Sequence, residues 1–187
     1  LLEDLAERLA AAVPVQAWPD TAVVLVGRGA TDPDANAEVA KVARLLLEGR
    51  GLGTVETSFV SLAEPGVPAA LDRAERLGFK RVVVLPYFLF AGVLPDRIVQ
   101  QARAWAAEHP DHEVLTAGLI GPSARLAALV HERWQELGTT DLRMNCDTCA
   151  YRVLMPGFED KVGRPQTPHD HPDDPTHQHP HHHAHHH

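Results

Sequence analysis

Two short runs of consecutive apolar residues limit most strongly what this chain can fold into. Residues 23–26 read VVLV and residues 82–85 read VVVL, with no polar residue inside either run. Strands with one solvated face alternate apolar and polar residues, so uninterrupted runs of this length are typical of strands buried on both faces of a parallel sheet. With two weaker β-like segments added, we expect strands at residues 21–27, 55–61, 81–87 and 113–118.

Helical patterns fill the intervals between these strands. The pair Asp32-Pro33 puts a capping side chain before a proline at the first helical position, which is typical of a helix start. Other helices are expected over residues 1–13, from Pro68 to Gly78, from Pro95 to about His109, and over residues 123–137. In the last helix we expect four apolar side chains to point inward: Leu126, Leu129, Val130 and Trp134. The alternation predicts an α/β fold, a doubly wound and mainly parallel four-stranded sheet flanked by helices.

Charge and hydropathy exclude two classes of partner. The chain of 187 residues has 17 Lys and Arg against 25 Asp and Glu, a formal net charge of −8. Binding to a nucleic-acid backbone needs a basic face, so no nucleic-acid partner is expected. No apolar run approaches the ~20 residues that cross a bilayer, so no membrane partner is expected either. We predict a cytoplasmic protein.

The end of the chain, residues 164–187, differs in composition from the rest. It is rich in Pro and Asp and has no aliphatic residue larger than Ala184, so we expect it to be disordered. It contains ten histidines, which in their neutral form are ligands for labile metal binding: His169, His171, His177, His179, His181, His182, His183, His185, His186 and His187. A purification tag is the alternative, but Asp, Pro and Gln interrupt the histidines, which favours a native metal-binding tail.

A closely spaced cysteine pair lies in the segment 141–163. Two thiolates at the spacing of Cys146 and Cys149 suit one metal ion or an iron–sulfur cluster. A redox dithiol would instead lie between a strand and the start of a helix, whereas this pair follows the last expected helix. A metal or iron–sulfur site is therefore favoured, and because one pair supplies only two ligands, further ligands must come from elsewhere.

Two loops after expected strands are candidate binding elements. Ligands of open α/β sheets bind at the carboxyl ends of strands, and the first such loop carries Arg28 and Gly29. A guanidinium there suits a carboxylate or phosphate, although a tight turn with a solvated arginine is an equal alternative. The third loop, residues 86–95, is unusually apolar. It either packs in the core, the favoured reading, or lines an apolar pocket or a partner surface.

The residues together resemble the sirohydrochlorin cobaltochelatases of the long CbiX type, which are class II chelatases. The resemblance rests on the motifs VGRG at 26–29, DPDAN at 32–36, PYFLFAG at 86–92, the pair Gly121-Pro122, the Met-x-Cys-x-x-Cys pattern and the His-rich end. It implies insertion of Co²⁺, the substrate metal, into sirohydrochlorin during cobalamin biosynthesis. It also implies a chelatase-like domain at residues 20–140 and an iron–sulfur cluster on the cysteine pair.

Members of the long type consist of two fused halves, and this chain resembles the second. The pattern Leu1-x3-Leu5-x-Glu7-Arg8 can be aligned with Leu126-x3-Val130-x-Glu132-Arg133. Chance explains so short a match equally well, but the resemblance favours residues 1–13 as the last helix of a preceding homologous half. That half, or a dimer partner, is the expected protein partner.

The sequence departs from the family where metal is bound. Arg28 and Leu94 replace two histidines of active halves, and Ser61 aligns with an acidic residue. We therefore expect no catalytic residue in this half and no metal insertion by this chain alone. Substrate contacts are expected from Arg28, Gly29 and Gly92. The alternative hypothesis is a non-enzymatic metal-binding or storage protein that uses the cysteine pair and the His-rich tail.

Overall fold

Across residues 1–136, which the computed structural model describes, four parallel strands form one sheet in the order β2-β1-β3-β4. The strands are β1 (Thr21–Gly27), β2 (Thr54–Phe59), β3 (Arg81–Pro86) and β4 (Glu113–Thr116). Strand β1 lies in the interior of the sheet, where Val24 is paired with Glu56 on one side and Val84 on the other. The predicted parallel four-stranded α/β fold is confirmed.

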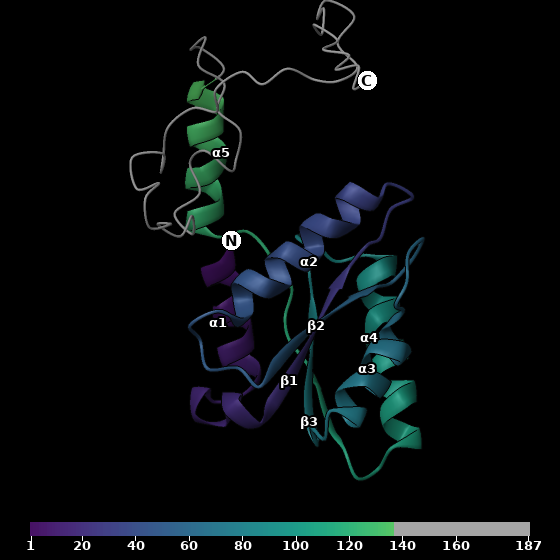
Figure 1. Ribbon diagram of the computed structural model, residues 1–187. Coiled ribbons are helices and arrows are strands. Elements are labelled where there is room, and N and C mark those ends of the chain that lie inside the picture. The colour runs from purple at the N-terminus through teal and green to yellow at the C-terminus, as the bar shows by residue number, and fades with distance from the viewer. Residues whose placement is uncertain (137–187) are drawn as a thin grey trace, which may run out of the picture. The chain divides into compact units, whose positions relative to one another are not determined.

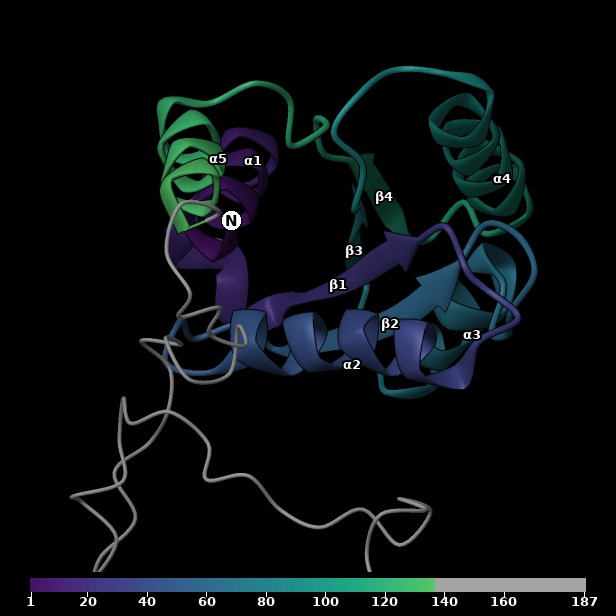
Figure 2. The same ribbon diagram turned by 90° about the horizontal axis from the view of Figure 1, so that it is seen from above.

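Helices cover both faces of this sheet: α1 (Leu2–Ala12), α2 (Pro33–Leu47), α3 (Val67–Arg76) and α4 (Val93–Glu108). A fifth helix, α5 (Ala124–Glu136), follows the last strand, and a short 3₁₀ helix, η1 (Val15–Asp20), precedes β1. Helices α1 and α2 pack on one face and α3 and α4 on the other, as Figures 1 and 2 show. Right-handed crossovers explain this division, because the chain moves in opposite directions along the sheet from β1 and from β3.

The uninterrupted apolar runs supply both hydrophobic cores. Val23 and Leu25 pack under α1 and α2, whereas Val24 and Val26 pack under α3 and α4. All four side chains are fully buried, because successive side chains of a strand point to opposite faces. The runs thus encode a strand with a helical layer on each side, as expected from the sequence.

Local signals place most element boundaries. The Asp32 carboxylate accepts a hydrogen bond of 3.0 Å from the Asp34 amide, and α2 begins at Pro33 as predicted. Helix α4 begins at Val93, two residues before the expected Pro95, because a proline is tolerated throughout the first helical turn, where amides lack intrahelical partners.

The expectation for α5 was wrong. Val130 and Trp134 are 62% and 71% exposed, and none of the residues of this helix is buried. The physical reason is that α5 follows the last strand and packs on neither face of the sheet, so its apolar stripe has no sheet core beneath it. The spacing of the apolar residues indicates a helix correctly, but it does not show which surface the apolar stripe of that helix faces.

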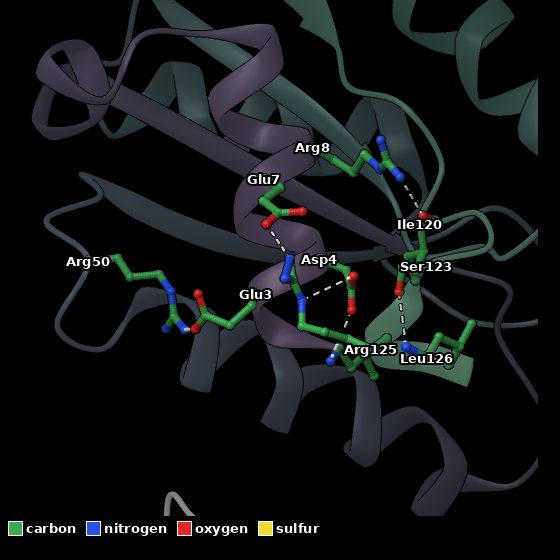
Figure 3. A network of polar contacts seen from close by, with 10 residues as sticks. Glu3, Asp4, Glu7, Arg8, Arg50, Ile120, Ser123, Arg125 and Leu126 are labelled. Atoms are coloured by element: carbon green, nitrogen blue, oxygen red, sulfur yellow. Dashed lines mark hydrogen bonds and ion pairs between the residues drawn. The ribbon is translucent and has the colours of Figure 1, made fainter. Parts of the chain in front are cut away.

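Helix α1 is tied to the start of α5 by a polar network, drawn in Figure 3. The Arg125 guanidinium forms ion pairs with Asp4, at 3.5 Å, and with Glu7. Arg8 donates a 3.0 Å hydrogen bond to the Ile120 carbonyl. Helix α1 is thus an integral layer of this unit, and its derivation from a preceding homologous half stays a prediction.

This network lowers the pKa of the Asp4 carboxyl. Burial by itself would raise that pKa, but the neighbouring Ser123 side chain and the positive charge of Arg125, 3.5 Å away, favour the charged carboxylate. A carboxyl whose pKa is lower in the folded than in the unfolded state contributes stability above its unfolded pKa of about 4, and this is lost as the pH falls through the folded value.

Asp4→Asn is therefore expected to flatten the acid side of the stability curve. The free energy of unfolding, measured by urea denaturation in steps below pH ~5, should fall less steeply with decreasing pH than in the wild type. Asp111→Asn removes an exposed loop carboxylate and serves as the matched control. Equal slopes for Asp4→Asn and the wild type would contradict the assignment.

Candidate functional site

Three loops that follow strands meet at the carboxyl edge of the sheet. Residues 28–32 follow β1, residues 60–66 follow β2, and residues 87–92 follow β3. The direction of the chain along the sheet reverses between β1 and β3, and such a reversal point is where open α/β sheets bind ligands. This edge is the candidate site.

The loop after β1 is held by one side-chain amide. Asn36, on the first turns of α2, accepts a 2.9 Å hydrogen bond from the Ala30 amide and donates one of 2.9 Å to the Ala30 carbonyl. Both polar groups of Ala30 are satisfied in this way, so the loop has a defined shape without belonging to a strand. Sequence reasoning noted Asn36 only as part of a motif and did not find this positioning role.

Gly29 joins the first loop to the second. Its φ is +88°, and a Cβ placed on it would lie 1.8 Å from the Ser61 carbonyl oxygen. The Ser61 amide donates a 3.0 Å hydrogen bond to the Arg28 carbonyl. The structure therefore brings Arg28, Gly29 and Ser61 together through their backbones, and the close approach that Gly29 permits is to the loop after β2.

None of the three positions at which the resemblance implies metal ligands in active halves provides a strong ligand here. The Arg28 side chain is exposed, and within residues 1–136 no partner contacts its guanidinium. Leu94 is half-buried in the first turn of α4 and packs against the core, and Ser61 is half-buried. A guanidinium repels cations and a Leu has no donor atom, so this edge suits an anionic group better than a metal ion.

Gly92 and Tyr87 complete the edge from the side of β3. Gly92 is extended and exposed, and a Cβ placed on it would meet no atom within 4 Å. Burial, together with the nearby charge of Glu38, raises the pKa of the Tyr87 phenol, which keeps it neutral and able to donate a hydrogen bond. Its place directly after β3 was the sequence signal for this residue, and it was missed.

A polar hollow of about 440 Å³ opens beside the loop after β2. It is lined by Phe59, Val60, Ser61, Leu62, Ala63, Glu64, Gly66 and Gln101. The buried Oε1 of Gln101 has no hydrogen-bond partner among the described residues. Leu62 has a φ of +60°, which bulky residues rarely adopt. This hollow extends the candidate site away from β1.

An apolar groove of about 590 Å³ lies between the loop after β3 and α5. It is lined by Phe90, Pro122, Ser123, Leu126, Ala127, Val130, His131 and Trp134. Phe90 and Val93 are 70% and 75% exposed, so the favoured expectation that this loop packs in the core was wrong for these two residues. The alternative, an apolar pocket or partner surface, agrees with the groove.

Several predicted sites lie outside the described residues. They are Cys146 and Cys149 and the ten histidines of the tail, and they stay predictions. Within the part of the chain that the structure describes, no helix is both long and apolar enough to cross a membrane.

The fold and the carboxyl-edge site together define a doubly wound α/β protein of the chelatase class. The chain belongs to the CbiX family, whose model matches residues 22–137. It is 42% identical over 134 residues to a sirohydrochlorin cobaltochelatase of Priestia megaterium, covering 72% of this chain and 44% of the relative. It is 31% identical over 136 residues to a sirohydrochlorin cobaltochelatase of Methanopyrus kandleri, covering 62% of this chain and 95% of that relative.

Solved structures agree with this assignment. SirB from Bacillus subtilis with Fe³⁺ is 26% identical with a TM-score of 0.63, over 74% of this chain and 53% of that one. A CbiX protein from Marinobacter aquaeolei shares the fold, with a TM-score of 0.55 at 24% identity over 65% of this chain and 99% of that one. This chain spans less than half the length of the P. megaterium relative. Membership of the CbiX family, which the sequence resemblance implied, is confirmed, whereas the long type with its cysteine pair and His-rich end stays a prediction.

Gly29→Ala is expected to destabilise the protein by about 2 kcal/mol or more. The new methyl group would collide with the Ser61 carbonyl, and the alanine would have to adopt a left-handed backbone conformation. Gly49→Ala is the matched control: Gly49 also has a positive φ, of +71°, but has open space around it. Its cost should be backbone strain alone, about 1 kcal/mol. Urea denaturation measures both, and equal losses would contradict the close approach.

Proposed function

We propose that this chain is one half of a sirohydrochlorin cobaltochelatase, an enzyme that inserts Co²⁺ into sirohydrochlorin in cobalamin biosynthesis. Membership of the CbiX family and 42% identity to a protein of that name support the class of reaction. The observation that carries the division into halves is the carboxyl edge itself, which has the family architecture but lacks metal ligands at Arg28, Ser61 and Leu94.

The metal ligands that this carboxyl edge lacks are groups that the reaction requires. Insertion exchanges Co²⁺ for two pyrrole protons, so the enzyme must present a partly dehydrated metal ion and accept two protons. Imidazole performs both tasks near neutral pH. Because Arg28 and Leu94 stand where the family has histidines, we assign metal presentation and proton acceptance to the other half.

This half then provides one wall of the macrocycle cleft. Sirohydrochlorin is a flat polycarboxylate, and the exposed Arg28 guanidinium at the carboxyl edge suits one of its carboxylates. The neutral Tyr87 phenol offers a hydrogen-bond donor on the side of β3. Gly92 has open space where a side chain would lie, which lets a flat ligand approach the backbone there. Gly29 instead lets the loop after β2 close against this edge.

The apolar groove along α5 is the docking surface for the other half. Its lining contains one titratable side chain, His131, and no Arg or Lys, so it does not suit a polyanionic macrocycle. The chain spans 44% of the P. megaterium relative, which leaves a segment of similar size as the occupant. The proposed occupant of the groove is a preceding chelatase half.

The cysteine pair and the tail complete the proposal. Cys146 and Cys149 would hold an iron–sulfur cluster, supported by their spacing alone. The ten tail histidines would gather cobalt for the reaction. Metal insertion needs no electrons, so the cluster is assigned no step in it.

The test is cobalt insertion into sirohydrochlorin, followed by absorbance under anaerobic conditions. We expect no rate above the spontaneous reaction for this chain alone, and activity when the preceding half is present, either fused or added. Iron and sulfide analysis of the same preparation checks the cluster. Activity of this chain alone would overturn the division into halves. Activity in neither preparation would favour the metal-storage alternative.

Docking is tested by placing a charge in the groove. Trp134→Glu should weaken binding between this chain and the separately expressed preceding half by about tenfold or more, because a large exposed aromatic side chain is a typical interface anchor. Ala128→Glu places the same charge on α5 outside the groove and should change the affinity less than about twofold. Calorimetry measures both.

Two results would overturn this docking surface. One is unchanged affinity of Trp134→Glu for the preceding half. The other is self-association of the wild-type chain in analytical ultracentrifugation that Trp134→Glu abolishes, since a second copy would then be the occupant.

A further inference from the structure

A second cluster of metal-ligating side chains lies at the opposite edge of the sheet. Asp72 and Glu75 are three residues apart on α3, and His109 follows the last residue of α4. One ligand atom from each of the three lies within 4.8 Å of the other two. His112, directly before β4, lies beside this cluster, with its Nε2 3.7 Å from Glu75 Oε1. Because it precedes a strand, it lies at the amino edge, away from Arg28, Ser61 and Leu94.

Trp105 orients two members of this cluster. Its indole Nε1 donates a 2.7 Å hydrogen bond to Asp72 Oδ1, and its carbonyl lies 2.8 Å from His109 Nδ1. A carbonyl only accepts, so Nδ1 carries the proton, and in the neutral ring the lone pair is on Nε2, which lies 3.9 Å from Glu75 Oε2. The indole also stacks on the His109 ring, with centroids 3.7 Å apart. Such outer contacts are typical of metal-ligating histidines.

The Glu75 carboxylate forms no hydrogen bond to either neighbouring imidazole. Its Oε1 lies 3.7 Å from Nε2 of His112 and its Oε2 lies 3.9 Å from Nε2 of His109, and both distances are too long for a hydrogen bond. The unpartnered buried atom of His112 is Nδ1, which an ion beside Nε2 would not reach, so His112 is a neighbour of the cluster and not one of its ligands. An ion between Glu75 and His109 would bind both groups.

The spacings fit a coordinated ion. Ligand atoms of a tetrahedral zinc site with bonds of about 2.1 Å are about 3.4 Å apart. The distance from His109 Nε2 to Glu75 Oε2, 3.9 Å, lies slightly above that value and beyond hydrogen-bond length. A small movement of the Glu75 carboxylate toward His109 would complete this edge.

We propose that Asp72, Glu75 and His109 bind one divalent transition-metal ion, of the Zn²⁺ or Co²⁺ class. An imidazole with two carboxylates suits these ions, whereas Ca²⁺ and Mg²⁺ prefer oxygen ligands only. The ion joins α3 to the segment between α4 and β4. The site is structural, and it does not depend on the function proposed above.

The experiment uses the full-length chain with competing ligands removed. The ten tail histidines are replaced by Gln, and Cys146 and Cys149 by Ser. Calorimetry with Zn²⁺ should then show one equivalent bound, Co²⁺ should give the visible absorption of a tetrahedral site, and either ion should raise Tm because it binds the folded state. His109→Ala and Asp72→Asn should each lower the affinity at least about tenfold.

His131→Ala is the matched control, because His131 is an exposed histidine on α5 whose ring contacts Gln135 rather than the cluster. It should bind Zn²⁺ like the parent. If His109→Ala does not fold, Glu75→Gln tests the same site, because it preserves the size and shape of the side chain but removes its charge. No stoichiometric binding by the parent, an equal loss in His131→Ala, or undiminished affinity in Glu75→Gln would each overturn the proposal.

Discussion

Burial of β1 on both faces is the constraint on which the rest of the structure depends. Every residue of this strand is buried, and it pairs with β2 on one side and β3 on the other. Neither face reaches water, so a helical layer must cover each. That requirement sets the direction of the crossovers, and the crossovers in turn create the reversal point at the carboxyl edge where Arg28, Gly29 and Tyr87 meet.

The carboxyl edge is built by backbone contacts rather than by its side chains. Asn36 shapes the loop after β1, and Gly29 allows that loop to touch the Ser61 carbonyl. This arrangement does not depend on the side chains of Arg28 and Leu94, where the resemblance implies histidines in active halves. A half without those histidines can therefore keep the shape of a cleft wall, which is what the proposed division of labour between halves requires.

The two edges of the sheet differ in chemistry. The carboxyl edge has the exposed Arg28 guanidinium and the neutral Tyr87 phenol and suits an anionic group. The amino edge gathers carboxylates and imidazoles from α3 and from the end of α4, and suits a cation. Because parallel strands carry the two sets of loops to opposite ends, a structural metal and an anionic substrate would not compete for one site.

The sequence by itself determined the strands, the helix starts and the family. Apolar runs report double-sided burial and Asp32-Pro33 reports a cap, because both depend on neighbours along the chain. Only the tertiary structure decided that Val130 and Trp134 face outward, that Gly29 touches Ser61, and that Glu75 meets His109 and His112. These contacts join residues far apart in sequence, and their partners are chosen by how layers pack. No local pattern encodes that choice.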